Sequence, residues 1–299
     1  FAKHGKIVHI DIDPSEINKN KVAHVPIVSD VGYALRELLQ ILDERGAQSA
    51  EREEGSGERS ALRAPRSPYA DWIRQIEEWR EAEPFRYTDR DDAIMPQYAI
   101  DRLWQIVRDR KQLDETIVTT GVGQHQMWAA QYWHFNSPRT WFTSGGLGAM
   151  GFGLPAAIGA QAAHPAKTVI DIDGDGSFLM NIQELACAFC EKLPVKVLLL
   201  NNQHLGMVVQ WEDRFYASNR AHTYLGAGHD QEPYPDFVTM SKGFRCGARS
   251  VCERADLDEA LEEMLDSDGP YVLDVLVPYQ EHVLPMIPSG MTVRDIIKA

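Results

Sequence analysis

Short apolar runs alternate with longer segments of mixed polarity through the second half of the chain. Five of these runs predict buried strands: Thr116–Thr120, Thr168–Ile172, Val195–Leu200, Ala248–Cys252 and Tyr271–Val277. The segments between them have helical spacing, for example over Asp256–Leu265, where Leu257, Leu261 and Leu265 fall on one side. This alternation indicates an α/β fold, a doubly wound parallel sheet with helices on both faces.

The first 45 residues have the same alternation on a smaller scale. Strands are predicted over Ile7–Ile12 and His24–Val28, and an amphipathic helix over Val31–Leu42. The apolar positions expected to form the buried face of this helix are Leu35, Leu38, Leu39 and Leu42. We interpret residues 1–45 as the C-terminal tail of a second α/β domain. Because the chain opens at Phe1 within a strand-like stretch, we expect it to be the C-terminal piece of a longer polypeptide.

Residues 46–95 are interpreted as a linker with one helix. From Gly46 to Pro68 the chain is polar and has no apolar spacing, which is typical of a flexible connection. An amphipathic helix is then predicted from the spacing of Trp72, Ile73, Ile76 and Trp79. The following helix starts at Pro96 and opens a C-terminal domain over residues 96–299.

Composition narrows the classes of partner. Of the 299 residues, 44% are hydrophobic and 25% are charged, as in soluble globular proteins. The formal net charge of −14 disfavours nucleic acid and anionic membrane, because both carry the same sign of charge. No apolar run approaches the ~20 residues that span a bilayer. A diphosphate stays compatible, since local amides and a metal ion set the field of such a site.

The cysteines predict neither a metal site nor a redox site. Cys187 and Cys190 lie in the helix expected after Ser177. No second ligand pair and no exposed turn accompany them, and zinc or redox sites need one of these. We therefore predict buried structural thiols and a reducing compartment.

The most specific pattern starts at the strand Thr168–Ile172. This strand leads to the turn Gly174-Asp175-Gly176, a helix is predicted to start near Ser177, and the next strand ends at Asn201-Asn202. A carboxylate and a carboxamide then lie at the carboxyl ends of two strands, where open α/β sheets bind phosphates. Oxygen ligands of this kind suit Mg²⁺ bridging to a diphosphate. Asn202 follows Asp175 by 27 residues. A Gly-Asp-Gly turn followed at this distance by two asparagines fits the signature of thiamine-diphosphate enzymes.

Longer blocks extend the similarity: Thr120–Ala130, Ser144–Ala157, Leu199–Met207, Gln210–Phe215 and Gln280–Gly290. With these blocks the chain resembles the catalytic subunits of the acetohydroxyacid synthase (acetolactate synthase) family, in particular those of plants and algae. The resemblance covers nearly the whole chain except residues 46–95.

The resemblance implies a site for thiamine diphosphate and Mg²⁺. The matching cofactor positions are Gln124, His125, Gly148, Ala149, Met150, Asp175, Gly176, Ser177, Asn202, His204, Gly206 and Met207. Among them, the side chains of Asp175 and Asn202 and the backbone carbonyl of His204 are the implied Mg²⁺ ligands. Met150 resembles the family's apolar wedge between the two cofactor rings; a methionine of the core is the alternative.

Two further sets of positions follow from the same resemblance. Trp211 and Ser289 match residues that line the family's substrate and inhibitor channel. The contacts of a second cofactor, FAD, match Asp11, Ile12, Asp30, Val31, Gly145 and Gly146. Residues 1–45 then correspond to the tail of a central, FAD-binding-type domain, in which an aspartate at a strand end suits a ribose hydroxyl.

For the complete enzyme, the resemblance implies decarboxylation of pyruvate and condensation with a second 2-keto acid, pyruvate or 2-oxobutyrate. This reaction leads to the branched-chain amino acids. The implied assembly is a homodimer or homotetramer with shared active sites, and a regulatory small subunit is a further expected partner. We expect a plastid location in a eukaryote and a cytoplasmic one otherwise. The family's activating glutamate belongs to an N-terminal domain, so no catalytic residue is assigned here and the chain alone is expected to be inactive.

Three alternatives stay open. Another thiamine-dependent carboligase or decarboxylase would share the cofactor site, although the blocks around Trp211 and Ser289 favour the first interpretation. The pair Asp171 and Asp173 resembles the nucleophile loop of haloacid-dehalogenase-type phosphatases, although Asp175 departs from that pattern. A non-catalytic fragment that binds a cofactor or pairs subunits is the third.

Overall fold

The computed structural model describes the backbone of residues 4–54, 69–226 and 234–298, and their side chains except those of residues 45–54. The chain divides into two compact units, residues 1–80 and residues 81–299. The domain limits expected from the sequence, after residues 45 and 95, differ from this division and stay predictions. Every helix among the described residues is too short or too polar to cross a bilayer.

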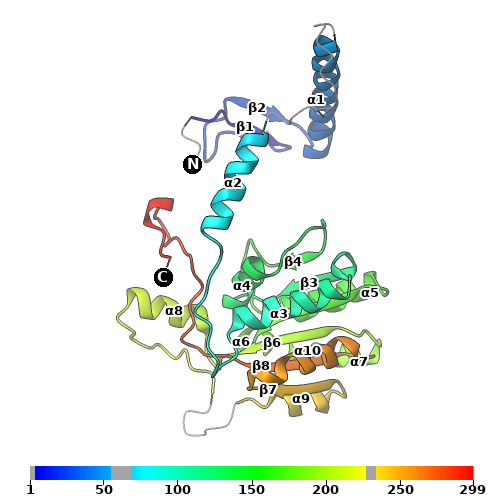
Figure 1. The fold of residues 1–299 in the computed structure, drawn as a ribbon, viewed down its shortest axis with the longest axis vertical. Helices are drawn as coiled ribbons and strands as arrows, with labels where there is room; N and C mark the ends of the chain where they lie inside the picture. Colours follow the sequence, from blue (N-terminus) through cyan, green and yellow to red (C-terminus); the bar gives the residue numbers. More distant parts are fainter. Residues whose placement is uncertain (1–3, 55–68, 227–233, 299) are drawn as a thin grey trace. The chain divides into compact units, whose positions relative to one another are not determined.

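A six-stranded sheet forms the centre of the larger unit (Figure 1). Its strands are β3 (Thr116–Thr120), β4 (Trp141–Thr143), β5 (Thr168–Gly174), β6 (Lys196–Asn201), β7 (Gly247–Val251) and β8 (Tyr271–Leu276). They pair in the order β4-β3-β5-β6-β8-β7, and every pair is parallel. The five predicted strands are therefore confirmed. The edge strand β4 was missed because its three half-exposed residues form no apolar run.

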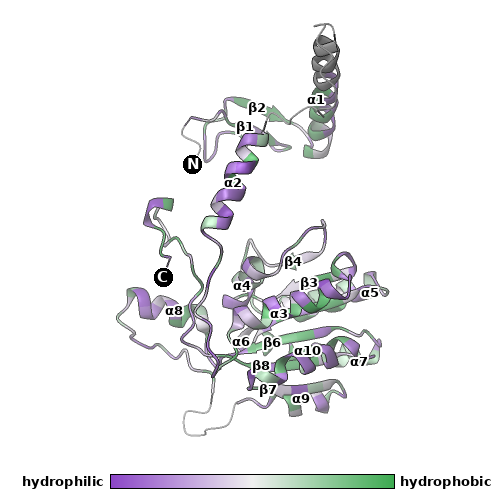
Figure 2. Ribbon diagram, in the orientation of Figure 1, coloured by the Kyte–Doolittle hydropathy of each residue, from purple (hydrophilic) through white to green (hydrophobic). Residues whose placement is uncertain are grey.

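Helices cover both faces of this sheet, which confirms the doubly wound fold. One face carries α3 (Pro96–Asp109), α4 (Gln124–Tyr132) and α10 (Leu257–Asp266), and the other carries α5 (Gly153–Ala163), α7 (Leu185–Cys190) and α9 (Phe237–Gly243). Successive residues of a strand point to opposite faces, so Val197 packs in the second of these cores and Leu198 in the first. Figure 2 shows the apolar strands between helices whose outer sides are polar.

Two short helices follow the carboxyl ends of the central strands. They are α6 (Asp175–Phe178) after β5 and α8 (Gly206–Phe215) after β6. Single 3₁₀ turns complete the unit: η1 (Leu113–Glu115), η2 (Ile182–Glu184), η3 (Arg254–Asp256) and η4 (Val293–Asp295).

The smaller unit has a parallel pair of strands, β1 (Val8–Asp11) and β2 (Val25–Val28), followed by α1 (Val31–Glu54) and by all but the last two residues of α2 (Ala70–Ala82). The α1 helix continues past Leu42 into the predicted linker, whose residues 55–68 lie outside the described ones. The predicted buried face of α1 was wrong, since Leu35, Leu38, Leu39 and Leu42 are exposed. Two strands offer too little surface to cover a helix of this length.

The prediction of buried thiols at Cys187 and Cys190 was also wrong, because both side chains are exposed and free. In α7 the residues that enter the core are Leu185 and Ala188. Each cysteine follows one of them by two positions, which is a rotation of about 200° around a helix of 3.6 residues per turn. The thiols therefore face away from the core.

Candidate functional site

A cavity of about 580 Å³, counting its open mouth, lies at the carboxyl ends of the central strands. Its wall is made by segments that follow β3, β5 and β6, by Val277 after β8, and by Met150 from the loop before α5. Gly174 of β5 is in register with Leu200 of β6, so the segments that follow these two strands emerge side by side. In open α/β sheets this edge is the usual place for a ligand.

Asp175 is the first residue of α6 and is 4% exposed. Burial raises the pKa of its carboxyl group to about 7, although hydrogen bonds from the backbone of Gly176 and Gln203 act in the opposite direction. A buried carboxylate in this position is poorly compensated by the protein alone. A cation at the cavity would supply the missing compensation.

Asn202 and His204 form a tight turn after β6. The backbone N–H of His204 donates to Asn202 Oδ1 at 2.9 Å, and His204 Nδ1 lies 2.7 Å from the carbonyl oxygen of Asn202. The imidazole also stacks on Tyr279, with ring centroids 4.1 Å apart. In the described part of the chain, no three His, Cys, Asp or Glu side chains are placed to hold a metal. Any metal bound here therefore depends on amide, carbonyl or ligand oxygens beside Asp175.

Ser177 ties two loops of the cavity to α6. Its Oγ accepts the backbone N–H of Gly151 at 3.0 Å and, more weakly, that of Val122 at 3.4 Å. Gly151 has a φ of 81°, and a Cβ there would lie 2.8 Å from Asn181 Nδ2. The glycine is therefore required both by conformation and by space.

Gln210 of α8 sets the orientation of Gln124, a role that no local pattern in the chain indicates. The backbone N–H of Val283 donates to Gln210 Oε1 at 2.8 Å, and Gln210 Nε2 donates back to the Val283 carbonyl at 3.1 Å. Because Oε1 of Gln210 is thereby the acceptor, Gln124 must donate to it through Nε2, at 2.9 Å. The side-chain oxygen of Gln124, Oε1, therefore points toward the backbone of Gly206.

A group of buried ionisable side chains lies behind the cavity. Asp173 Oδ1 is 3.2 Å from His125 Nε2, although the angles are not those of a hydrogen bond, and Thr119 Oγ1 donates to Asp171 at 3.0 Å. Burial and the neighbouring Asp173 raise the pKa of Asp171 well above its usual value. The sequence motif that contains Asp171 and Asp173 marks both as candidate functional residues. Its alternation of polar and apolar positions does not indicate that both side chains are fully buried.

Three of the described residues that line the cavity each have a buried polar atom without a hydrogen-bond partner. These atoms are Gln124 Oε1, His125 Nε2 and Trp128 Nε1, all in side chains that are nearly inaccessible. Buried polar atoms are almost always paired in folded proteins. A cavity lined by the buried Asp175 carboxyl group and by polar side chains that are incompletely hydrogen-bonded fits a ligand that brings a cation, as a magnesium diphosphate does.

The structure brings together most, not all, of the residues implied by resemblance. Ten of the twelve cofactor positions line the cavity, but Gly148 and Ala149 do not. The implied channel residues do not line it either: Trp211 packs against Phe215 with ring centroids 4.9 Å apart, and Ser289 is exposed.

The implied FAD residues lie in both units. In the smaller unit the backbone N–H of Ser29 donates to the Asp11 carbonyl at 2.9 Å, which brings Asp30 beside the end of β1. Asp30 also accepts the backbone N–H of Tyr33 at 2.9 Å in the first turn of α1. Gly145 and Gly146 belong to the larger unit, in the exposed loop after β4.

Comparisons with known proteins give two family matches. Residues 121–275 match the thiamine pyrophosphate enzyme C-terminal TPP binding domain, and residues 1–38 match the thiamine pyrophosphate enzyme central domain. Acetolactate synthase 1, chloroplastic, of Oryza sativa subsp. japonica is 52% identical over 298 residues, which is 99% of this chain and 43% of that protein. Acetolactate synthase, chloroplastic, of Arabidopsis thaliana is 50% identical over 99% of this chain and 41% of its own length. The chain thus spans less than half of these relatives.

Proposed function

The chain belongs to the thiamine pyrophosphate enzymes, and on this premise we propose that its cavity holds thiamine diphosphate and Mg²⁺ within an acetolactate synthase. The proposed reaction joins pyruvate, after loss of carbon dioxide, to a second 2-keto acid, either pyruvate or 2-oxobutyrate. The products lead to the branched-chain amino acids isoleucine and valine.

One observation carries the proposal. A buried carboxylate, Asp175, and an amide, Asn202, line one cavity at the carboxyl ends of β5 and β6, together with residues that have unpaired polar atoms. We assign the Mg²⁺ ligands to the side chains of Asp175 and Asn202 and the carbonyl oxygen of His204. This donor set is hard and incomplete, so diphosphate oxygens are required to fill the remaining positions.

The protein's own residues bind and orient. Ser177 and the backbone after Gly123 line the cavity and are assigned to the diphosphate, and Met150 contributes an apolar side chain to the same wall. Thiamine diphosphate, when bound, supplies the electron sink that permits cleavage beside a ketone. The surrounding apolar side chains exclude water that would protonate the reacting carbon.

We propose that the activating glutamate comes from outside the described residues. No glutamate of the described part of the chain lines the cavity. Activation of the cofactor needs a carboxylate against its pyrimidine ring, so this chain alone is expected to bind and not to turn over.

The remaining partners are proposed from the family resemblance of the sequence alone. We propose FAD as a second cofactor, with Asp11, Ile12, Asp30 and Val31 at the ends of β1 and β2, and Gly145 with Gly146 as further contacts. A homodimer or homotetramer, a regulatory subunit and a plastid location in a eukaryote belong to the same proposal, the last supported by chloroplastic relatives.

Calorimetry tests the site directly. The 299-residue chain is titrated with thiamine diphosphate in the presence and absence of Mg²⁺, beside its Asp175→Asn variant. We expect binding that requires both Mg²⁺ and Asp175. Equal binding by parent and variant would remove Asp175 from the proposed site.

Product analysis tests the reaction. The full-length protein given pyruvate should release acetolactate. Acetaldehyde as the main product would instead support the alternative of a thiamine-dependent decarboxylase. The phosphatase alternative is disfavoured by the structure, because Asp171 is fully buried and absent from the cavity wall, so no phosphate ester reaches it.

A further inference from the structure

Two exposed thiols lie on one face of α7. Cys187 and Cys190 are both free and are separated by one helical turn. The α7 helix precedes the first residue of β6, whereas α8 and the cavity come after the last one, and Figure 1 shows α7 and α8 at opposite ends of the sheet. The pair is therefore remote from the cofactor site, and its chemistry is independent of the proposed function.

The outward direction of these thiols is fixed by the other face of the helix. Leu185 and Ala188 are completely buried in the apolar core. The carbonyl oxygen of Leu185 also accepts the thiol of Cys246 at 3.8 Å. Because the core side of α7 is anchored in this way, both cysteines are presented to solvent together.

The spacing suits a bond between the two sulfurs. Residues i and i+3 of an α-helix have Cα atoms about 5 Å apart, from a rise of 1.5 Å per residue and a radius of 2.3 Å. Disulfides accept Cα separations of about 4.4–6.8 Å, so the backbone is within range. The Cβ atoms, at about 5–6 Å, must approach by roughly 1–2 Å.

The end of α7 can provide this approach. Cys190 is the last residue of the helix, and the chain leaves it at Lys192 with a φ of 54°. A 3₁₀ turn brings the side chains of residues i and i+3 into eclipse, and helix ends adopt it readily. The turn before α7, η2, already has this geometry.

The other two cysteines of the chain, Cys246 and Cys252, differ from this pair in burial or in spacing. Burial raises the pKa of the Cys246 thiol to about 11, so it stays protonated and unreactive. Cys252 is exposed but does not lie one helical turn from another cysteine. No third His, Cys, Asp or Glu joins the α7 pair as a metal ligand within the described ranges, so chemistry between two sulfurs is favoured over a structural zinc site.

We propose that Cys187 and Cys190 form a reversible dithiol–disulfide pair that exchanges with small-molecule disulfides such as oxidised glutathione. One thiolate attacks the disulfide, forms a mixed disulfide and releases one reduced thiol. The second cysteine, as its thiolate, then displaces the other reduced thiol and closes the bond between Cys187 and Cys190. Two electrons and two protons pass from the pair to the disulfide reagent, which leaves as two thiols.

Redox titration of the whole chain tests this proposal. The protein is equilibrated in buffers of reduced and oxidised glutathione, alkylated, digested and examined by mass spectrometry. We expect the peptide from α7 to lose two hydrogens and to carry no glutathione. In the buffer that half-oxidises the pair, glutathionylated Cys252 should be at least about tenfold less abundant, because closure within one turn is favoured by effective concentration.

Variants separate a pair from two independent thiols. Cys187→Ser should trap glutathione on Cys190, and Cys190→Ser should trap it on Cys187, whereas Cys252→Ser, the matched exposed control, should leave the closed disulfide unchanged. Far-UV circular dichroism checks that each variant folds.

A measurement on the parent chain needs no variant. A trivalent arsenical, phenylarsine oxide, binds two neighbouring thiols, and one equivalent should block both α7 cysteines from alkylation. Independent glutathionylation of Cys187 and Cys190 in the parent chain, or no protection by the arsenical, would overturn the proposal.

Discussion

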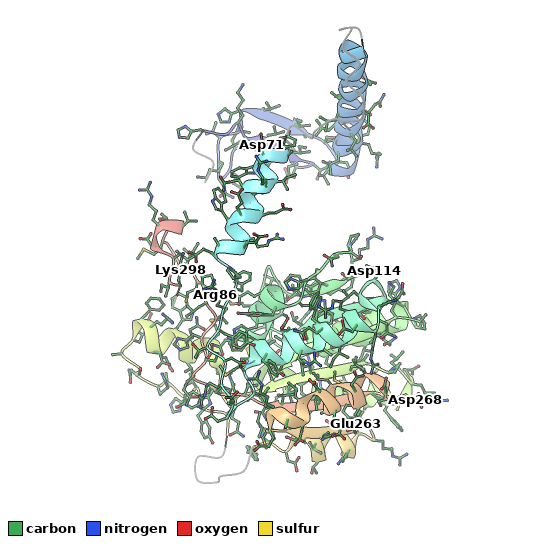
Figure 3. The ribbon with its side chains drawn as sticks, in the orientation of Figure 1. Asp71, Arg86, Asp114, Glu263, Asp268 and Lys298 are labelled. Carbon is green, nitrogen blue, oxygen red and sulfur yellow. The ribbon has the colours of Figure 1, made fainter. Side chains whose placement is uncertain are left out.

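Buried polar groups at the two ends of the central sheet differ in how completely they are hydrogen-bonded. At the amino end, Lys196 is 3% exposed and donates to the carbonyl oxygens of Ser267 at 2.5 Å and Gly269 at 2.8 Å. Asp114 and Asp268, both labelled in Figure 3, precede β3 and β8 and mark this end of the sheet. At the carboxyl end, Gln124 and His125 have unpaired polar atoms, and backbone hydrogen bonds only partly offset the burial of the Asp175 carboxyl group.

This difference separates groups that contribute to stability from groups that are available for binding. Paired buried groups contribute to the free energy of unfolding, whereas unpaired ones cost stability. The cost is tolerated where a ligand completes the pairing, which is the usual relation between stability and function. Substitution of polar groups at the carboxyl end should therefore weaken ligand binding, whereas substitutions at the amino end should change stability and leave binding unchanged.

The largest effect is expected at Asp175. Asp175→Asn removes the charge that compensates a bound cation, so the affinity for Mg²⁺ and thiamine diphosphate should fall at least about 100-fold, or roughly 2.7 kcal/mol. The variant without ligand should be as stable as its parent or more stable at pH 8, because burial of the carboxylate no longer costs anything. Calorimetry and thermal unfolding measure the two quantities. If Asp175→Asn bound thiamine diphosphate and Mg²⁺ normally but unfolded at a lower temperature than its parent, Asp175 would serve stability and not binding.

The next effect is expected at two glycines of α5. A Cβ on Gly153 would lie 2.4 Å from Asp171 Oδ1 and 2.6 Å from the backbone nitrogen of Gly121, so Gly153→Ala should cost about 2–3 kcal/mol of unfolding free energy. Gly159, later in the same helix, has nothing within 4 Å of a new Cβ, and Gly159→Ala should gain about 0.5–1 kcal/mol. Urea unfolding measures both. Equal changes in unfolding free energy for the two variants would mean that side chains at the carboxyl end of the sheet are packed no more tightly than elsewhere.

A pair of buried glutamines allows a matched test. Gln210 pairs with Val283 and Gln124 near the cavity, whereas Gln161 donates to the carbonyl oxygens of His164 and Lys167 near the amino end of β5. Replacement of either by leucine should cost about 1–3 kcal/mol through unpaired backbone groups.

Only Gln210→Leu should also weaken cofactor binding, by about tenfold, or roughly 1.4 kcal/mol. Calorimetry on both variants measures the affinity, and urea unfolding provides the stability control. If Gln161→Leu weakened binding as much, Gln210 would have no specific positioning role.

The smallest effect concerns pH. Burial lowers the pKa of Lys196 to about 8, from 10.5. Between these values the unfolded chain binds more protons than the folded one, so this group adds stability as pH rises from about 8 to 10.5.

The gain is expected to be about 1–2 kcal/mol, less than the full shift would give, because the hydrogen bonds to the carbonyl oxygens of Ser267 and Gly269 favour the charged ammonium group. Urea unfolding at several pH values, compared with Lys196→Met, isolates it. The same slope in parent and variant would assign the pH dependence to another group.

The sequence predicted the fold well where apolar runs were long. The strands over Thr116–Thr120 and Lys196–Asn201 were found within one residue, because continuous burial leaves a continuous apolar pattern. The GDG turn and Asn202 were placed at one edge because parallel strands share an edge. Burial of helix faces was harder to predict: α1 and α7 have suitable apolar or thiol positions that the tertiary structure leaves exposed.

The site was predictable as a set of residues and not as a network. Which side chains line the cavity followed largely from the motif blocks, whereas the fixed orientation of Gln124 depends on Val283, which is distant in sequence and pairs through Gln210. The packing of Trp211 against Phe215, away from the cavity wall, likewise depends on how α8 packs against the rest of the protein. Neither arrangement leaves a local pattern in the chain.

The parallel order of the strands also determines when the cavity can exist during folding. Its wall takes residues from four strand ends, and Gln210 is paired only after Val283, beyond β8, has docked. Contacts this far apart in sequence form late, since each closes a long loop of chain. Capture of the cofactor would then report that β3, β5, β6 and β8 have all assembled, so thiamine diphosphate binding could serve as an all-or-none assay of refolding.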